Sequence, residues 1–499
     1  MPVSTLILSS SLALQLVSGA APAAPAKPSA PAKSAAPAKK AYAPPLAVAE
    51  KLVGPALTEG HSYARLAELT DGIGPRLSGS EGAAAAVQWA LKSFKADGVK
   101  AWTEPVKVPR WVRGEERAEI LPSATTRGHP LFILALGGSP PTAPEGLTAE
   151  VVEVTSLEAL ATLGDSVKGK IVFFNHTMSS PADYGRFAGL RGRGPALAAK
   201  AGAVGSLVRS LATASLRTPH TGSTRFDDEG PRIPAASVTT EEADQLHRLL
   251  AKGPVRVKMV LGCSELPDAD SHNVVAEVRG REKPQEIVLI SAHLDSWDVG
   301  TGAHDDGAGV VMVMEAARLI AKLPQSPRRT VRVVLYMNEE NGLRGGRAYA
   351  EAHAAELPKH VAAMEMDSGG GRPVAVSLRS GPGGKELLEP WLSPLVALGA
   401  AQFSTREAGG ADISPLLPAR VPFFGVEVDA SRYFDVHHTH ADTLDKVDPQ
   451  DLARSTAATA WVTYAMAESP DTLARPEAPT GPPGGGAPVA APPKAASGH

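Results

Sequence analysis

Histidine, aspartate and glutamate residues gather in a few short runs in the second half of this 499-residue chain. Each run follows an apolar stretch or precedes a helix-like one, and the runs are His293–Asp295, Asp305–Asp306, Glu339–Glu340, Asp367 and His437–Asp442. Taken singly, they have ordinary explanations, because an aspartate after a strand commonly caps a turn or a helix. Their shared placement indicates one site instead, since ligands of open α/β sheets bind beyond the carboxyl ends of the strands.

The residue types in these runs favour zinc. Imidazole and carboxylate groups are zinc ligands, and the single cysteine, Cys263, excludes a site built mainly on thiolates as well as any intrachain disulfide. Two metal ions need a carboxylate that bridges them, and together they acidify one water molecule. A separate carboxylate must then take the proton, and the neighbours Glu339 and Glu340 provide one base and one ligand. Asp295 lies two residues after His293 on an extended chain, so we expect it to fix the imidazole of His293.

Alternating strands and helices must position these side chains. We predict strands at 287–292, 330–337, 361–366 and 422–428, and helices at 308–323, 346–355 and 450–467. This alternation predicts an α/β fold in which helices cover both faces of a central sheet.

A region with a different pattern of short β-like runs interrupts this alternation of strands and helices. Between about 113 and 262, short β-like runs such as 170–174, 204–208 and 255–261 alternate with glycine and proline turns, whereas 63–98 is helical in pattern. We therefore predict a catalytic domain formed by residues 48–112 and 263–469, with a β-rich insert at residues 113–262.

The two ends of the chain have a composition that does not build a core. Residues 6–17 are apolar but too short to span a bilayer, and small residues follow them, so we predict a signal peptide at 1–21. No lysine or arginine precedes Leu6, and an uncleaved apolar tail is the alternative. The Ala/Pro/Lys-rich residues 22–47 and the similar residues 470–499 are predicted to be disordered. We expect a secreted or periplasmic protein without a membrane anchor.

The overall charge gives no sign of a nucleic-acid partner. Lys and Arg number 50 and Asp and Glu number 53, a net charge of -3, whereas nucleic-acid-binding domains usually carry a marked basic excess. Partners must therefore be recognised in a site and not by the charge of the whole molecule.

The motifs resemble those of the zinc exopeptidase family that includes bacterial di-zinc aminopeptidases, glutamate carboxypeptidase and carboxypeptidase Q. The matching stretches are HLDSWDVGTGAHDDGAG from His293, NEENGLRGG from Asn338, EMDSG from Glu365, HHTHADT from His437 and LAELTDGIGPRLSGS over 66–80. The insert resembles a protease-associated domain in VKGKIVFF from Val167 and KAGAVGSL from Lys200. Residues 218–239 are most similar to the carboxypeptidase Q branch, and the resemblance covers about 66–467.

The resemblance implies a mixed central sheet and a site with two zinc ions. His293 and Asp367 would complete one zinc site, Glu340 and His438 the other, and Asp305 would bridge the two; Glu339 would be the general base and later the acid. His438 is chosen among the neighbouring histidines because it directly precedes Thr439 in the family's His-Thr-x-x-Asp-Thr pattern. The family also implies a cis peptide between Asp305 and Asp306, a homodimer, and dipeptides or short peptides with free termini as substrates.

Three other interpretations stay open at this point. A relative of glutaminyl cyclases would close an N-terminal glutamine ring with one zinc, although the insert and the complete second ligand set disfavour it. A catalytically inactive relative would use the same fold as a binding module, although all ligands and the base are retained. A purely structural metal site would leave the spare carboxylates of Asp295 and Glu339 unexplained.

Overall fold

The computed structural model describes residues 44–214 and 216–478. The predicted signal peptide (1–21), most of the predicted linker (22–43) and residues 479–499 of the predicted tail lie outside the described residues. Within the described ranges, no helix is long and apolar enough to cross a membrane.

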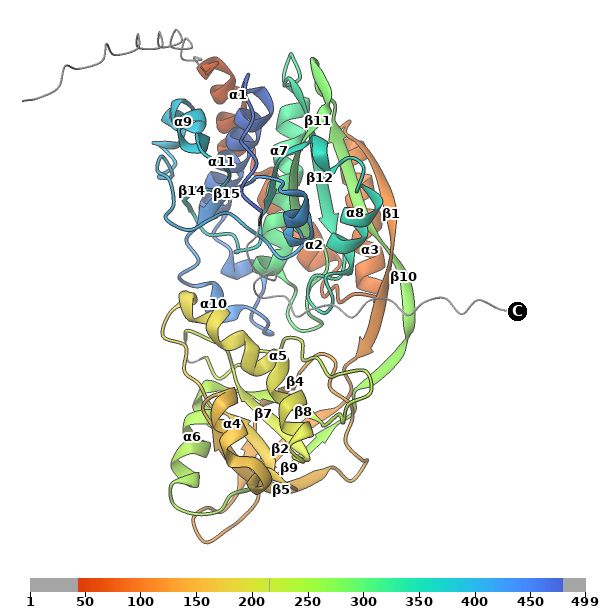
Figure 1. The fold of residues 1–499 in the computed structure, drawn as a ribbon, viewed down its shortest axis with the longest axis vertical. Helices are drawn as coiled ribbons and strands as arrows, with labels where there is room; N and C mark the ends of the chain where they lie inside the picture. Colours follow the sequence, from red (N-terminus) through yellow and green to blue (C-terminus); the bar gives the residue numbers. More distant parts are fainter. Residues whose placement is uncertain (1–43, 215, 479–499) are drawn as a thin grey trace, which may run out of the picture. The chain divides into compact units, whose positions relative to one another are not determined.

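A seven-stranded mixed sheet forms the centre of the predicted catalytic part (Figure 1). Its strands, in spatial order, are β1 (Lys100–Val112), β10 (Ser264–Val278), β12 (Arg329–Tyr336), β11 (Lys283–His293), β13 (His360–Glu365), β15 (Phe423–Val428) and β14 (Pro373–Arg379). The four strands β12, β11, β13 and β15 run parallel, while the pairs at the two edges are antiparallel. The predicted mixed α/β architecture is confirmed.

Helices cover both faces of this sheet because its strands are apolar on both sides. Ile290 and Val333 belong to one hydrophobic cluster, and their neighbours Leu289 and Val334 belong to another on the opposite face, as the period of two requires. The first face packs against α1 (Leu46–Thr58), α2 (His61–Gly72), α3 (Glu81–Ala96), α7 (Ala308–Ala321) and α11 (Pro449–Glu468), and the second against α8 (Arg344–Ala352). Short helices α9 (Gly384–Leu388) and α10 (Tyr433–Val436) complete the part.

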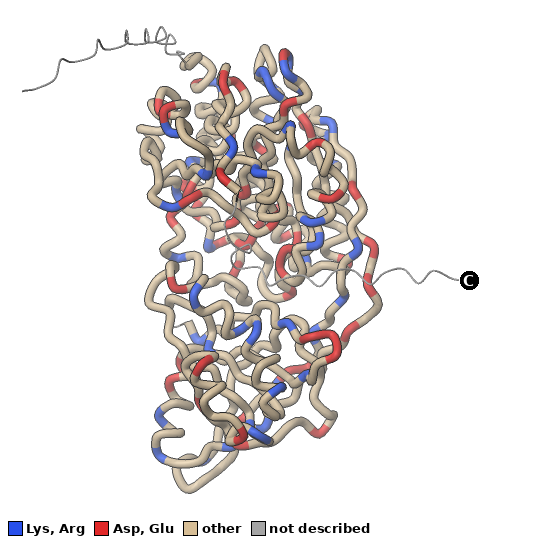
Figure 2. The backbone as a smooth tube through the Cα atoms, in the orientation of Figure 1, with Lys and Arg blue, Asp and Glu red and all other residues tan. Residues whose placement is uncertain are grey.

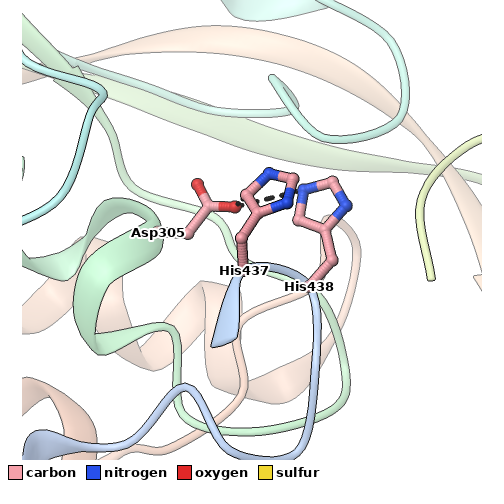
Figure 3. Close-up of side chains that lie close together, drawn as sticks. All are labelled: Asp305, His437 and His438. Carbon is pink, nitrogen blue, oxygen red and sulfur yellow. Dashed lines mark ion pairs between the residues drawn. The ribbon is translucent and has the colours of Figure 1, made fainter. Parts of the chain in front are cut away.

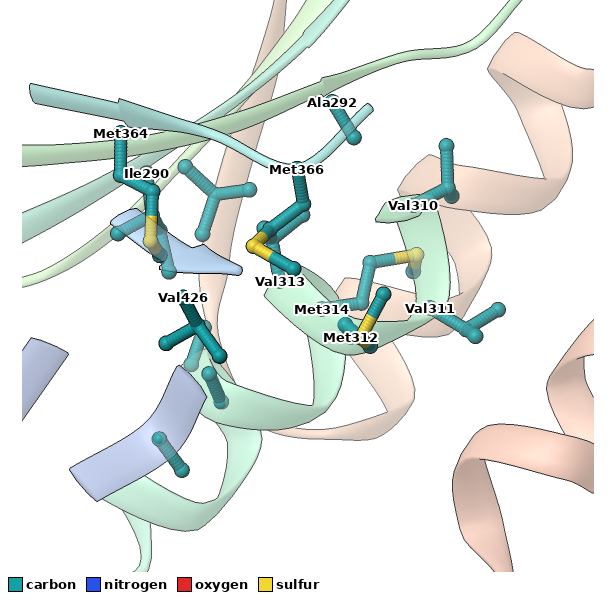
Figure 4. Packing of buried hydrophobic residues seen from close by; sticks show 14 of the residues in the cluster. Ile290, Ala292, Val310, Val311, Met312, Val313, Met314, Met364, Met366 and Val426 are labelled. Atoms are coloured by element: carbon teal, nitrogen blue, oxygen red, sulfur yellow. The ribbon is translucent and has the colours of Figure 1, made fainter. Parts of the chain in front are cut away.

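Helix α7 lies in the middle of the core, and the loop that contains Asp305 and Asp306 directly precedes it. Its residues from Ala308 to Ile320 are all buried, which fits a sequence that is apolar almost all round. Figure 4 shows Val310 to Met314 of this helix packed near Ile290 and Ala292 of β11, Met364 of β13 and Met366 just after β13. The loop that precedes α7 is therefore held against the end of β11 by a rigid, buried helix.

Residues 116–261, within the predicted insert, form a second, eight-stranded sheet. Its strands, in spatial order, are β3 (His129–Leu131), β2 (Glu116–Ile120), β9 (Arg256–Leu261), β5 (Leu147–Val154), β6 (Ile171–Phe174), β7 (Gly205–Arg209), β8 (Ala235–Val238) and β4 (Ile133–Ala135). Three helices accompany it: α4 (Leu157–Leu163), α5 (Tyr184–Lys200) and α6 (Thr240–Leu250). All eight strands lie between residues 116 and 261, and the long antiparallel pair β1 and β10 connects the two sheets.

Two segments differ from the predicted boundaries. Helix α1 begins at Leu46, inside the predicted linker, because Ala49, Leu52 and Ala56 give it a buried face. Beyond α11, Leu473 is buried and Arg475 donates hydrogen bonds to the carbonyls of Ala419 and Pro358. Residues 470–478 therefore belong to the folded part. Figure 2 shows basic and acidic residues intermixed along the described chain, in agreement with the small net charge.

Candidate metal centre

The strand order brings three of the predicted runs to one edge of the sheet. β11 lies between β12 and β13, parallel to both, with His293 paired to Tyr336 and Ser291 paired to Glu365. The carboxyl ends of these strands therefore present His293, Glu339–Glu340 and Asp367 side by side. Asp305 reaches the same place from the loop before α7, and His438 from the loop after α10.

Asp305 and His293 form the first half of the centre with Asp367. The Nε2 atom of His293 lies 3.1 Å from Oδ1 of Asp305 and 3.7 Å from Oδ1 of Asp367. His293 and Asp305 are buried, whereas Asp367 is partly exposed. The adjacent Asp306 also lies close to His293 and Asp367, with ligand atoms of the three within 4.8 Å of one another, but its two oxygens already accept the backbone N–H groups of His293 and Gly309. The peptide between Asp305 and Asp306 is cis, as expected.

The other oxygen of Asp305 faces the second half of the centre. His438 Nε2 lies 3.1 Å from Asp305 Oδ2 and 3.0 Å from Oε2 of Glu340. His437 stacks on His438 with 3.6 Å between ring centroids, and its Nε2 lies 3.3 Å from Asp305 Oδ2. Figure 3 shows the two rings side by side, with Asp305 facing them. Because His438 reaches two carboxylates and His437 only one, the geometry favours His438 as the ligand.

The centre has the charge and the free donor atoms that suit divalent cations. Burial and the neighbouring Asp305 raise the pKa of Glu340 to about 7, although His438 opposes the shift. Burial, Asp367 and Glu340 together raise the pKa of Glu339 well above its usual range, although His293 opposes the shift. Oε1 of Glu340 is buried without a hydrogen-bond partner among the described residues. Buried carboxylates in excess of the nearby cationic groups are stabilised by bound metal ions, so this donor set fits zinc.

Backbone carbonyls orient both imidazole rings. Nδ1 of His293 lies 3.0 Å from the carbonyl oxygen of Asp295, and Nδ1 of His438 lies 3.2 Å from the carbonyl oxygen of Thr221. A ring that donates from Nδ1 leaves the lone pair of Nε2 free for a metal ion. Both Nε2 atoms face Asp305.

The carboxylate of Asp295 does not hold the imidazole of His293 as expected. Its Oδ1 lies 3.9 Å from His293 Nδ1, beyond hydrogen-bond distance, and accepts instead the backbone N–H groups of Asn338 (2.7 Å) and Glu339 (3.1 Å). Its Oδ2 accepts the hydroxyl of Ser78. Asp295 therefore contacts the imidazole of His293 through its backbone carbonyl, whereas its carboxylate binds the turn after β12. Spacing along a strand gives the side on which a carboxylate lies but not the donors that it meets there.

Glu339 carries the spare carboxylate of the site. Its side chain is half-buried and lies within electrostatic reach of His293, Asp367 and Glu340. Among the described residues, no side chain donates a hydrogen bond to it or forms an ion pair with it. It is therefore free to exchange a proton.

Two buried residues that sequence reasoning did not single out build the loop around Asp305. Asp442 accepts the backbone N–H of His304 at 2.7 Å and that of Asp305 at 3.1 Å. Arg76 is fully buried and donates to the carbonyls of Leu294, Gly74, Thr301 and Gly302. Arg76 lies in the family-like motif over 66–80 and Asp442 in that over 437–443. Their place in these motifs is the feature of the sequence that could have identified them.

Comparison with known proteins gives matches over most of the chain. A family model described as Peptidase family M28 matches residues 273–463. The chain is 38% identical to carboxypeptidase Q of Homo sapiens over 419 residues, which is 84% of this chain and 87% of the relative. The structure of a peptidase M28 precursor from Shewanella amazonensis SB2B is similar, with 40% sequence identity and a TM-score of 0.82. The match covers 86% of this chain and 97% of the Shewanella chain. A zinc aminopeptidase from Bacillus subtilis shares the fold, with 19% sequence identity and a TM-score of 0.60. The match covers 84% of this chain and 96% of the Bacillus chain.

Proposed function

We propose that this chain, which belongs to peptidase family M28 and is a zinc-dependent exopeptidase, cleaves short peptides at a centre that holds two zinc ions. His293 and Asp367 are proposed to ligate one ion, Glu340 and His438 the other, and Asp305 both. Asp295 is proposed to support the site by holding the backbone of Glu339.

The position of Asp305 carries this proposal. Its Oδ1 lies 3.1 Å from Nε2 of His293 and its Oδ2 lies 3.1 Å from Nε2 of His438, so each oxygen faces a different imidazole. A carboxylate that lies between two such groups has the arrangement that a bridging ligand needs. The remaining carboxylates, Asp367 and Glu340, are divided between the two sides in the same way.

The residues of the chain divide the chemical work. Zinc ions held there would polarise the scissile carbonyl as Lewis acids and would acidify a water molecule. Glu339 takes the proton of the attacking water and returns it to the departing amine, and a positioned carboxylate of this kind typically contributes ~10²–10⁴-fold to the rate. The carboxylate of Glu339 is half-buried beside the proposed ligands and, among the described residues, forms no ion pair, which suits a group that must both accept and give up a proton.

Short peptides with free termini are the proposed substrates. The relative of Homo sapiens is named carboxypeptidase Q and the structural neighbour from Bacillus subtilis is named a zinc aminopeptidase, so both kinds of exopeptidase occur among the similar proteins. These matches support a peptidase over the cyclase interpretation, and the complete ligand set with a free Glu339 supports an active enzyme over a binding module.

Organisation and location complete the proposal. We propose that residues 113–262 form an insert in one catalytic domain, which is supported by the confinement of the second sheet to residues 116–261. Export to the periplasm or the medium and assembly as a homodimer remain proposals that rest on the sequence of residues 1–21 and on the family resemblance respectively.

A peptide assay tests the function. A free dipeptide, its N-acetylated form and its C-amidated form are incubated with the purified full chain, with and without a zinc chelator. We expect hydrolysis of the free dipeptide, loss with chelator and recovery when zinc is restored. If only N-acetylation abolishes hydrolysis, the enzyme is an aminopeptidase, and if only C-amidation abolishes it, the enzyme is a carboxypeptidase. If each modification by itself abolishes hydrolysis, the enzyme is a dipeptidase. Ammonia release from a glutaminyl peptide without peptide cleavage would contradict the proposal in favour of a cyclase.

A further inference from the structure

The insert touches the metal centre through a reciprocal contact between Thr221 and His438. The backbone N–H of Thr221 donates to the carbonyl oxygen of His438 at 3.0 Å, and Nδ1 of His438 lies 3.2 Å from the carbonyl oxygen of Thr221. Thr221 belongs to the insert, 217 residues away from His438 in the sequence. A proposed metal ligand of the catalytic part is thus oriented by the backbone of the insert.

Only one of the neighbours of His438 Nδ1 is able to accept its proton. Among the residues that the structure describes, the groups at hydrogen-bond distance from this nitrogen are the Thr221 carbonyl and, at 3.4 Å, Nη1 of Arg191. A guanidinium donates but does not accept hydrogen bonds. His438 binds a metal ion through Nε2 only if Nδ1 carries the proton. The metal-binding tautomer therefore depends on the position of the Thr221 carbonyl.

Arg191 fixes that carbonyl. This arginine of α5 is 8% exposed, and its Nη1 donates to the Thr221 oxygen at 3.1 Å while its Nη2 donates to the hydroxyl of Tyr184 at 2.8 Å. The guanidinium lies directly against Gly222, whose φ of +139° favours glycine, and a Cβ there would lie 2.2 Å from Arg191 Cζ. The close approach of Arg191 to this backbone thus requires a glycine.

We propose that Arg191 is a positioning residue that orients His438 through the Thr221 carbonyl and so sets the zinc affinity of the half-site formed by Glu340 and His438. The inference rests on the proposed two-zinc function and adds a role for the insert in metal binding. Helix α10, which directly precedes the loop of His438, has further anchors, because Thr213 donates its hydroxyl to Asp435 at 2.9 Å and its backbone N–H to the carbonyl of Phe434 at 3.3 Å. Replacement of Arg191 is therefore expected to change the orientation of His438 and not to detach the loop.

Zinc binding to the metal-stripped full chain tests the proposal. Wild type, Arg191→Leu, Arg193→Leu and His438→Ala are titrated with zinc against a competing chelator, which reports the affinity of each equivalent without reference to activity. Loss of a group that orients a metal ligand typically costs roughly 10–100-fold in affinity, and we expect this loss for one of two equivalents in Arg191→Leu. Arg193 is an exposed arginine on the same helix, so Arg193→Leu should bind zinc as wild type does.

The four proteins separate the inference from the function on which it rests. If His438→Ala keeps both equivalents at wild-type affinity, the proposed ligand set is wrong. If His438→Ala loses one equivalent while Arg191→Leu keeps both, only the role of Arg191 is wrong. Should Arg191→Leu fail to fold, Arg191→Lys takes its place: it retains the charge but lacks the paired nitrogens that serve Thr221 and Tyr184 together. The same weakening is expected, and wild-type affinity in that variant overturns the inference.

Discussion

The carboxylate of Asp295 holds the backbone of Glu339 in place. Oδ1 of Asp295 accepts the N–H of Glu339 at 3.1 Å and that of Asn338 at 2.7 Å, and Asn338 has a φ of +77°, in the left-handed region. The turn that contains both the proposed base Glu339 and the neighbouring proposed ligand Glu340 is thus stabilised by one buried carboxylate. Its influence on the reaction acts through Glu339 and Glu340 and does not require contact with a substrate.

Asp295→Asn tests this relationship. In Asp295, one carboxylate oxygen accepts from the backbone of Glu339 and the other from the hydroxyl of Ser78. The amide of asparagine has one acceptor oxygen and one donor nitrogen, so it cannot accept at both positions. We expect kcat to fall by about 10–100-fold, as for other groups that support a metal centre. Asp270→Asn, at an exposed aspartate, is the control and should keep wild-type kcat. Wild-type kcat in Asp295→Asn would mean that the turn does not need this carboxylate.

Glu339→Gln separates proton transfer from metal binding. Glutamine has nearly the same shape but cannot take a proton from water, so kcat should fall by ~10²–10⁴-fold. The zinc content, measured by elemental analysis, should stay that of wild type because Glu339 is not a proposed ligand. Glu351→Gln, at an exposed glutamate on α8, serves as the control. A Glu339→Gln protein with near-normal turnover would remove Glu339 from the role of base.

Asp442→Asn should loosen the metal without touching a ligand. Asp442 accepts the N–H groups of His304 and Asp305 with its two oxygens, and an amide retains only one acceptor. We expect zinc affinity to weaken by roughly 10–100-fold because the bridging carboxylate is held less firmly. Asp445→Asn, three residues further on and with a side chain that is 69% exposed, is the matched control. Equal affinities of the two variants in a chelator competition would contradict the role of Asp442.

The fold could be predicted from the sequence where burial follows from composition. The strands at 287–292 and 330–337 and the helix at 308–323 are apolar enough to be buried, and β11, β12 and α7 lie there within a few residues. Helix α1 was missed in part because the Ala/Pro/Lys-rich segment before it and Pro55 within it hide its apolar face. The long pair of β1 and β10 was also missed, since its pairing is a contact between distant parts of the chain.

The residues of the candidate site could be predicted from the sequence, but their hydrogen-bond partners could not. The strand-end positions identified His293, Glu339, Glu340 and Asp367 together, and the resemblance selected His438, which the distances to Asp305 and Glu340 favour. The partners of these groups could not be predicted, because hydrogen bonds such as that between His438 and Thr221 join residues that are 217 positions apart in the sequence. Spacing along the chain contains no information about such contacts.

A pH-dependent stabilising contact lies away from the centre, at His353. Burial lowers the pKa of His353, but hydrogen bonds to Glu104 and Glu356 outweigh it, so the pKa lies above its ordinary value of 6.5. Both ring nitrogens contact carboxylates, at 3.0 Å for Glu104 and 2.9 Å for Glu356, which requires the protonated ring. Because the folded pKa is raised, this stabilisation is complete below the unfolded pKa and is lost as pH rises through the folded pKa.

His353→Gln should therefore destabilise the protein more at low pH than at high pH. In urea unfolding of the metal-stripped chain, we expect a difference from wild type of roughly 1 kcal/mol at about pH 5.5, which shrinks towards about pH 9. His247→Gln is the control, since that histidine also meets a carboxylate, Glu153, but its side chain is 61% exposed. A His353→Gln difference that stays constant or grows with pH would show that the charged ring does not stabilise the fold.

The central claim is that Asp305 lies between two zinc ions. Crystals of the zinc-loaded full chain, measured on both sides of the zinc absorption edge, locate zinc directly by anomalous scattering. We predict two peaks about 3.5–4 Å apart that flank the Asp305 carboxylate, one beside His293 and Asp367 and the other beside Glu340 and His438. A single peak in zinc-saturated crystals, or a pair located away from Asp305, would contradict the account.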